Sequence, residues 1–339
     1  MSRIDVGSAI APAFDHMVKV LFRPFVFRKW LALGFLALFL GGGGGGGGGN
    51  WGNVFSNDHG GNMPNMGAWL SHYWPFLVAA ALFGFLIVIF VSWIAAVFNF
   101  VYIDDVVRGS GAIKEPFARL KGLGTSLFLW DIIFGLIVST ILIVLVAFPL
   151  ILAFVLMPNA PDALKILSVV WAVMAALPII FVAATIGALT RHFVGNAMYV
   201  RGTGVLAAWK IVLHILKANI GQVILYFLLL LVFGLGIGMA SLIAALGLLL
   251  ILAIPFGGLA LIGYLIGIAL GLTWSAPVIA IVAVYAGIVG MIYAYLMSCI
   301  MQPAMVFLQA FSLVVIGQAD PTLVTIPITR PESVPPQAG

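Results

Sequence analysis

The sequence carries very little charge, and this scarcity decides the class of protein to which it belongs. Only 7% of its 339 residues are Asp, Glu, Lys or Arg, whereas 64% are hydrophobic. Soluble domains have about 25% charged residues, so a chain with so few could not cover a surface in water. Lipid tails remove that requirement because they solvate apolar side chains. The composition excludes an ordinary soluble fold and predicts an integral membrane protein.

Cysteine and clustered polar residues are also scarce. Cys299 is the single cysteine, which excludes an intramolecular disulfide. The histidines form no His-x-x-x-His pair, and no catalytic triad, pair of catalytic carboxylates or cofactor fingerprint is visible. We therefore expect a protein that is not an enzyme and that has no cofactor and no metal.

Apolar runs bounded by charged residues predict the membrane helices, since one crossing needs about 20 residues. The runs cover residues 30–40, 74–103, 126–157 and 164–200. The stretch between Lys217 and Asp320 then contains no charged residue and allows two or four crossings. These runs predict an all-α polytopic transmembrane helix bundle with about six membrane helices, and eight is the alternative. With six, the apolar segment between Pro255 and Pro277 is expected to form a re-entrant or interfacial hairpin.

Lys and Arg are concentrated in alternate loops. The net charge is +5, and no basic stripe typical of nucleic-acid binding is present, so we expect no nucleic-acid partner. The basic segments hold Arg3, Lys19, Arg23, Arg28 and Lys29; Arg108, Lys114, Arg119 and Lys121; and Arg201, Lys210 and Lys217. The loop over residues 41–73 has none, and Lys165 is the exception to the alternation. The positive-inside rule then predicts a multi-pass protein of the plasma (inner) membrane with both termini cytoplasmic.

Glycine and proline mark the segments outside the bundle. Residues 41–73 begin with nine glycines and predict a flexible exterior loop, because glycine loses the most backbone entropy on ordering. Residues 319–339 are rich in proline and predict a disordered cytoplasmic tail. The sequence thus predicts one integral membrane domain over residues 1–318, with the glycine-rich loop inside it.

A short motif occurs twice and suggests an internal repeat. Arg108-Gly109-Ser110-Gly111 and Arg201-Gly202-Thr203-Gly204 each follow an apolar run and precede a basic segment. A fainter copy opens the chain at Gly7-Ser8. The expected unit is an interfacial helix followed by a membrane hairpin, present three times.

Two basic segments have the pattern of interfacial helices. In residues 205–218, apolar residues recur at helical spacing, with Lys210 and Lys217 toward another side. The apolar set is Leu206, Trp209, Val212, Leu213 and Leu216. Residues 113–123 give a shorter version with Lys114, Arg119 and Lys121. We predict that these five cations contact anionic lipid headgroups; plain cytoplasmic loops are the alternative.

Four polar residues are expected within the membrane. Asp131 is a functional candidate by its depth, and we expect it to pair with Lys121 or Arg191; an ion or proton role is the alternative. Asn99, Asn196 and Gln302 occupy equivalent places if the repeat is real, and we expect them to hydrogen-bond between helices instead of forming a solute site. Asp104 and Asp105 are expected to pair with nearby basic residues instead of binding a metal.

Several of these motifs together resemble a known group of sequences. They are the glycine run after a short first helix, the Tyr102–Gly109 segment with Pro116-Phe117 beyond it, and Ser126-Leu127-Phe128-Leu129-Trp130. The chain resembles, up to about Gln318, an uncharacterised family of bacterial multi-spanning membrane proteins. That family is distantly similar to the membrane domain attached to some glycerophosphodiester phosphodiesterases. The resemblance implies a membrane bundle without assigned catalytic residues, and the chain has no phosphodiesterase domain.

Two functions fit these observations. The first is a non-enzymatic, lipid-embedded module in membrane or envelope organisation, with anionic lipid as partner and protein partners unknown. The second is a transporter or channel for a small solute, favoured by the repeat, the proline-interrupted helices and Asp131. A membrane-bound enzyme is the third.

Overall fold

The computed structural model describes residues 4–43, 66–271 and 276–326, and its secondary structure in these ranges is entirely helical. The α-helices are α1 (Ile10–Phe22), α2 (Phe27–Gly43), α3 (Met66–Arg108), α4 (Lys114–Leu142), α5 (Phe148–Ile151), α6 (Asp162–Leu189), α7 (Gly195–Arg201), α8 (Val205–Ala218), α9 (Ile220–Leu252), α10 (Gly258–Ala269), α11 (Ala276–Ile300) and α12 (Gln302–Ala319). Short π-helical segments join several of them, at Ile143–Ala147, Leu152–Leu156, Thr190–Val194 and Ala253–Gly257. The predicted all-α class is confirmed.

Contacts divide the described residues into two units. The first contains residues 4–43, 101–117 and the described part of 215–326; the second contains residues 66–100 and 118–214. Helices α3, α4 and α8 therefore each contribute to both. Residues 44–65 of the predicted glycine-rich loop and residues 327–339 of the predicted tail lie outside the described residues. Within the described part of that tail, Leu323 and Ile326 are buried beside the 3₁₀ turn Pro321–Leu323.

Six helices of the described chain are long and apolar enough to cross a membrane. Where α-helices and π-helical segments join, they form continuous rods of 43 residues at Lys114–Leu156, 40 at Asp162–Arg201 and 50 at Ile220–Ala269. At about 1.5 Å per residue these rods are about 60 to 75 Å long. Almost none of their most apolar windows is buried by protein. Their apolar side chains need another apolar medium, and lipid tails provide it.

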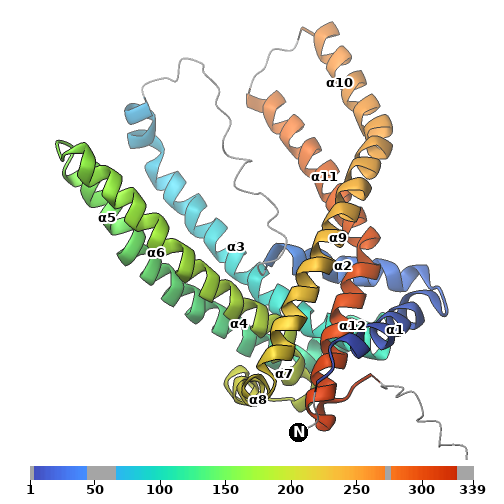
Figure 1. The fold of residues 1–339 in the computed structure, drawn as a ribbon. Helices are drawn as coiled ribbons and strands as arrows, with labels where there is room; N and C mark the ends of the chain where they lie inside the picture. Colours follow the sequence, from blue (N-terminus) through green and yellow to red (C-terminus); the bar gives the residue numbers. More distant parts are fainter. Residues whose placement is uncertain (1–3, 44–65, 272–275, 327–339) are drawn as a thin grey trace, which may run out of the picture. The chain divides into compact units, whose positions relative to one another are not determined.

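The expected hairpin between Pro255 and Pro277 does not form. Helix α10 continues α9 through the π-helical segment at Pro255, and α11 returns from the far end (Figure 1). Proline lacks the N–H that an α-helix needs at this point, and the π-helical turn absorbs this defect without ending the helix. The residues after Lys217 thus supply one long helical pair, in agreement with two crossings.

The six helices that are long and apolar enough to cross a membrane are not the same six helices that the sequence predicted. Helix α12 qualifies by length and composition, but most of its most apolar window is buried by protein, and it follows α11 after a single turn residue, Met301. Helix α2, the predicted first crossing, has 17 residues and is not among the six. If α11 and α12 are counted as one kinked rod and α2 is counted as a crossing, the number of crossings is again six, as the loop charges predict.

The core of the first unit is built around α12. Helix α1 packs along it with Ala13, Met17 and Leu21 buried. On α12, Phe311 stacks on Tyr226 of α9, with ring centroids 5.2 Å apart. Buried aromatic pairs of this kind stabilise a core by about 1 kcal/mol beyond the area that they bury.

Helices α2 and α11 approach each other closely in the same unit. Tyr295 donates a hydrogen bond to the Leu31 carbonyl at 3.1 Å, and Ser298 donates one to the Gly34 carbonyl at 2.7 Å. A Cβ atom on Gly34 would lie 2.2 Å from the Cys299 Sγ atom. Gly34 is therefore required by the close packing of the two helices, in the manner of small residues in membrane bundles.

The second unit has a comparable close contact between α3 and α4. Trp93 donates an indole N–H to the Thr125 hydroxyl at 3.0 Å. A Cβ atom on Gly124 would lie 2.6 Å from the Val97 Cα atom. Farther along, Trp130 of α4 lies against Trp209 of α8, with ring centroids 5.9 Å apart.

Candidate functional site

Helix α8 has the boundaries predicted for the second interfacial helix, but its faces differ from the predicted ones. The side buried by protein consists of Val205, Ala208, Val212 and Ile215. Leu206 and Leu213, which were expected on a different side from the lysines, are 66% and 46% exposed. Small side chains at positions 205 and 208 allow the helix to pack on that side, so the larger leucines are turned outward.

The exposed side of α8 combines apolar and basic side chains. Leu206, Lys210, Leu213 and Lys217 are all exposed and follow one another at intervals of four, three and four residues. This spacing places them in one stripe along the helix. Leucines beside lysines suit the boundary between acyl chains and headgroup phosphates.

The other three predicted headgroup cations lie at the start of α4. Lys114, Arg119 and Lys121 are all exposed. The prediction of a short separate helix over residues 113–123 is wrong, because α4 begins at Lys114 and continues without a break to Leu142. Gly122 and Gly124 lower helix propensity but do not end the helix, and the close contact with α3 explains the glycine at position 124.

A cluster of charged groups lies where α3 ends. Asp104, which is buried, forms an ion pair with Arg108 at 3.0 Å, so the local pairing expected for it is confirmed. The Asp105 Oδ1 atom accepts hydrogen bonds from the Ser110 hydroxyl at 2.8 Å and the Gly111 N–H at 2.7 Å. Its Oδ2 atom is buried and has no hydrogen-bond partner among the described residues.

Lys29 of α2 supplies the opposite charge to Asp105. The two groups attract each other electrostatically, and the Lys29 ammonium also donates to the Val20 carbonyl at the end of α1. The turn after α3 fits around this lysine: a Cβ atom on Gly111 would lie 3.3 Å from the Lys29 Cα atom. Sequence reasoning missed this pairing because the partners are far apart in the chain and neither lies in a motif with the other.

The two Arg-Gly-x-Gly motifs end their helices in the same way. Gly109 and Gly202 have φ angles of 67° and 63°. Each donates its N–H to the carbonyl four residues earlier, on Asp105 and on Met198 respectively. Glycine is favoured at this left-handed position because it has no Cβ atom.

Gln302 connects three helices of the first unit. Its Oε1 atom accepts a hydrogen bond from the Tyr102 hydroxyl of α3 at 3.3 Å, and its Nε2 atom donates to the Ser298 carbonyl of α11 at 3.0 Å. Ser298 in turn donates to Gly34 of α2. This buried amide thus forms a hydrogen bond with a side chain of α3 and another with the backbone of α11.

The other two amides lie near each other in the second unit. Asn196 donates to the His192 carbonyl of its own helix at 2.8 Å. Asn99 of α3 faces Gly195, whose Cβ atom would lie 3.7 Å from the Asn99 Nδ2 atom. That Nδ2 atom is buried and has no hydrogen-bond partner within the described residues.

Asp131 lies on the surface of α4 and attracts Arg191 of the neighbouring rod electrostatically. Arg191 was one of the two expected partners. It belongs to the π-helical segment Thr190–Val194, whose extra residue changes which side of the helix each side chain faces. The charges of the two groups thereby partly compensate each other.

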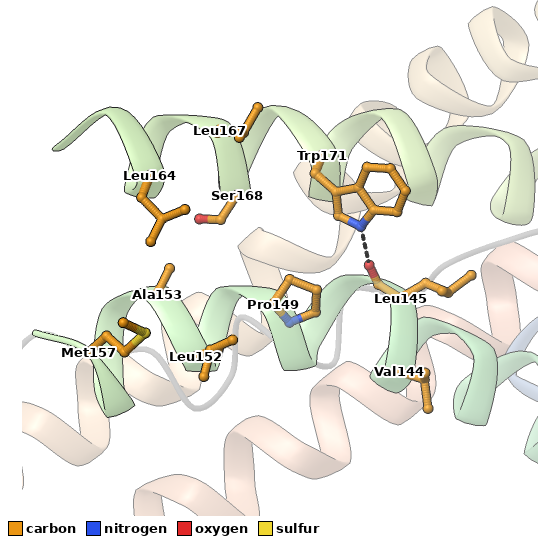
Figure 2. Close-up of a pocket in the computed structure, with 10 residues that line it drawn as sticks. All are labelled: Val144, Leu145, Pro149, Leu152, Ala153, Met157, Leu164, Leu167, Ser168 and Trp171. Atoms are coloured by element: carbon orange, nitrogen blue, oxygen red, sulfur yellow. Dashed lines mark hydrogen bonds between the residues drawn. The ribbon is translucent and has the colours of Figure 1, made fainter. Parts of the chain in front are cut away.

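A groove of about 480 Å³ lies between α6 and the π-distorted end of the preceding rod in the second unit (Figure 2). In an α-helix the Leu145 carbonyl would accept the N–H of residue 149, which is a proline. Instead it accepts the Trp171 indole N–H across the groove at 2.9 Å. Most of the lining is apolar, and its hydroxyl, on Ser168, donates to the Lys165 carbonyl. The groove suits an acyl chain better than a polar solute.

No cluster of three metal-ligating side chains occurs in residues 4–43, 66–271 and 276–326. The long apolar rods and the cations at their ends define a polytopic α-helical membrane protein. Residues 4–326 match the model of DUF7544, a family of unknown function, and the chain belongs to that family. No curated protein and no solved structure matches the chain significantly.

Proposed function

We propose that the protein is a non-enzymatic, lipid-embedded module that binds anionic headgroups and acts in the organisation of the plasma membrane or envelope. The observation that carries this proposal is the exposed stripe of α8, in which Leu206 and Leu213 alternate with Lys210 and Lys217. Lysines in the headgroup layer each gain about 1 kcal/mol from an anionic leaflet. Lys114, Arg119 and Lys121 add three exposed cations in the loop region assigned to the same side.

The sidedness of the proposal follows from loop charge. With α2 and five longer rods as crossings, the basic segments before α2, after α3 and after α7 are all cytoplasmic, as are both termini. The matching ends of α3 and α7 at Gly109 and Gly202 support the internal repeat. The likeness to the membrane domain of glycerophosphodiester phosphodiesterases stays a prediction.

Lipid retention tests this proposal. The variant with Lys114, Arg119, Lys121, Lys210 and Lys217 all replaced by Gln is purified in mild detergent, and its bound lipid is identified by native mass spectrometry. We expect the parent to retain phosphatidylglycerol or cardiolipin and the variant to lose most of it. Lys165→Gln, on the opposite side by the order of the crossings, is the control and should retain the lipid. Equal retention by parent and five-site variant would show that the proposal is wrong.

A transporter or channel is the second candidate, and the charge on the surface of α4 favours it. Asp131 lies at membrane depth with Arg191 as its electrostatic partner, which is an arrangement found on ion and proton pathways. Purified protein in sealed vesicles would then carry a flux of protons or small ions that is lost in Asp131→Asn. Equal flux in protein-containing and empty vesicles would exclude conduction of the ions tested.

A further inference from the structure

The corner between α1 and α2 presents an unusual surface. Residues 22–28 are all exposed, and their sequence, Phe-Arg-Pro-Phe-Val-Phe-Arg, combines three aromatic and two basic side chains. Phe22, Phe25 and Phe27 are 45%, 57% and 66% exposed. Phenylalanine is normally buried in soluble surroundings, so three exposed rings in seven residues need an apolar medium of their own.

Ring contacts and hydrogen bonds from Trp30 and Lys29 hold the corner against the end of α1. The Trp30 ring lies against Phe22 and Phe25, with ring centroids 5.6 and 5.7 Å away. Its indole N–H donates to the Leu21 carbonyl at 3.0 Å, and the Lys29 ammonium donates to the Val20 carbonyl. These bonds satisfy carbonyls that the end of α1 leaves open.

The charges of the corner are free to bind an external anion. Arg23 and Arg28 are exposed, and neither has an ion-pair partner in the described part of the chain. Residues 22–28 contain no Asp or Glu. A guanidinium group binds phosphate oxygens in a bidentate manner, while aromatic rings favour the layer just beneath the headgroups.

We propose that this corner is a membrane anchor that inserts into an anionic leaflet, with Phe22, Phe25 and Phe27 below the phosphates and Arg23 and Arg28 bound to them. The apolar helix α2 continues directly from the corner (Figure 1). With α2 as the first crossing, as proposed above, the corner lies at the edge of the bilayer. The anchor rests on the proposed function in that it requires a lipid-embedded protein, but it uses none of the five cations assigned there.

Site-directed spin labelling tests the anchor in the full chain. A nitroxide is attached to Val26→Cys in a Cys299→Ser background, which leaves the three phenylalanines and both arginines in place. The protein is reconstituted into vesicles of phosphatidylethanolamine with phosphatidylglycerol, and into vesicles of phosphatidylcholine alone. Collision of the label with oxygen, which concentrates in acyl chains, is compared with collision with a water-soluble nickel chelate. A label on Thr322→Cys serves as the aqueous control.

We expect oxygen to dominate at position 26 in the anionic vesicles and the nickel chelate to dominate at position 322. Phe25→Ser combined with Phe27→Ser should reverse the result at position 26. Arg23→Gln combined with Arg28→Gln should reduce insertion in anionic vesicles to its level in phosphatidylcholine. The anchor would be overturned if the nickel chelate dominated at position 26 in anionic vesicles. It would also be overturned if the insertion at position 26 were the same with and without anionic lipid and with and without the two arginines.

The same label separates this inference from the proposed function. If the five-site variant keeps its lipid while position 26 remains inserted, the proposed headgroup cations are wrong and the anchor stands. If the five-site variant loses its lipid while position 26 of the parent reads as aqueous, the anchor alone is overturned. A protein partner bound at the corner would give that second result.

Discussion

The backbone of Gly124 in α4 lies directly against the backbone of Val97 in α3. A Cβ atom added to Gly124 would lie 2.6 Å from the Val97 Cα atom and 2.9 Å from its backbone nitrogen. Neither atom can move aside without shifting a whole helix. This contact fixes how α3 and α4 pair within the second unit.

We therefore expect Gly124→Ala to lower the free energy of unfolding by about 1 to 3 kcal/mol, the usual cost of overpacking. Gly122→Ala is a matched control two residues away, because a Cβ atom there meets nothing within 4 Å. The control should be neutral or slightly stabilising, since alanine favours the helix more than glycine does. Thermal unfolding in detergent measures both, and equal melting temperatures would contradict the close contact.

Gly34→Ala should also destabilise the protein, through α2 and α11. The added methyl group would collide with the Cys299 Sγ atom, which lies 2.2 Å from the Cβ position. Cys299→Ala removes that sulfur and should restore part of the lost stability in the double variant. A double-mutant cycle on melting in detergent checks this, because additive effects would mean that the two residues do not touch.

The buried amides predict a graded loss of stability. Gln302→Ala should cost the most, about 1 kcal/mol, because both ends of its side chain are hydrogen-bonded. Tyr102→Phe removes one of these bonds and should add little further loss in the Gln302→Ala background. Asn99→Ala should have the smallest effect, since its Nδ2 atom has no partner among the described residues. If Asn99→Ala, Asn196→Ala and Gln302→Ala all melt like the parent, these amides do not stabilise the bundle.

His16 predicts a dependence of stability on pH. Its Nε2 atom donates to the Val106 carbonyl at 2.8 Å. Burial lowers the pKa of His16 from 6.5, and the charges of Lys19 and Lys29 lower it further, against the opposing effect of that hydrogen bond. The unfolded chain thus binds the proton more readily, so this stability is complete above pH 6.5 and is lost as the pH falls below it.

Melting temperatures above and well below pH 6.5 test this expectation. His16→Gln keeps an N–H donor for the carbonyl but cannot titrate, so its melting temperature should fall less on acidification. A parent and a variant with the same pH response would show that His16 does not contribute.

Much of the architecture was predictable because one physical requirement dominates the sequence. Apolar runs between charged residues located the long rods, and helical spacing located α8 with the boundaries that the structure shows. The faces of α8 were predicted less well, because periodicity does not show whether a leucine faces protein or lipid. Both are apolar media, and only the packing of Val205 and Ala208 distinguishes them.

The contacts among polar groups were harder to predict. Asp104 pairs with a residue four positions away, and such local pairs can be read from the sequence. The attraction between Lys29 and Asp105 depends on how α2 meets the end of α3, which no local pattern encodes. The continuation of α9 into α10 was missed because the segment after Pro255 was predicted to form a separate hairpin, whereas a π-helical turn accommodates the proline within the helix.

The 50-residue rod over Ile220–Ala269 has a consequence for the lipid around it. The hydrocarbon layer is about 30 Å thick, and a rod of about 75 Å fits within it only when inclined by about 65° from the membrane normal. Transmembrane helices incline by about 20° on average. A change in acyl-chain length would therefore change the mismatch between this rod and the hydrocarbon layer.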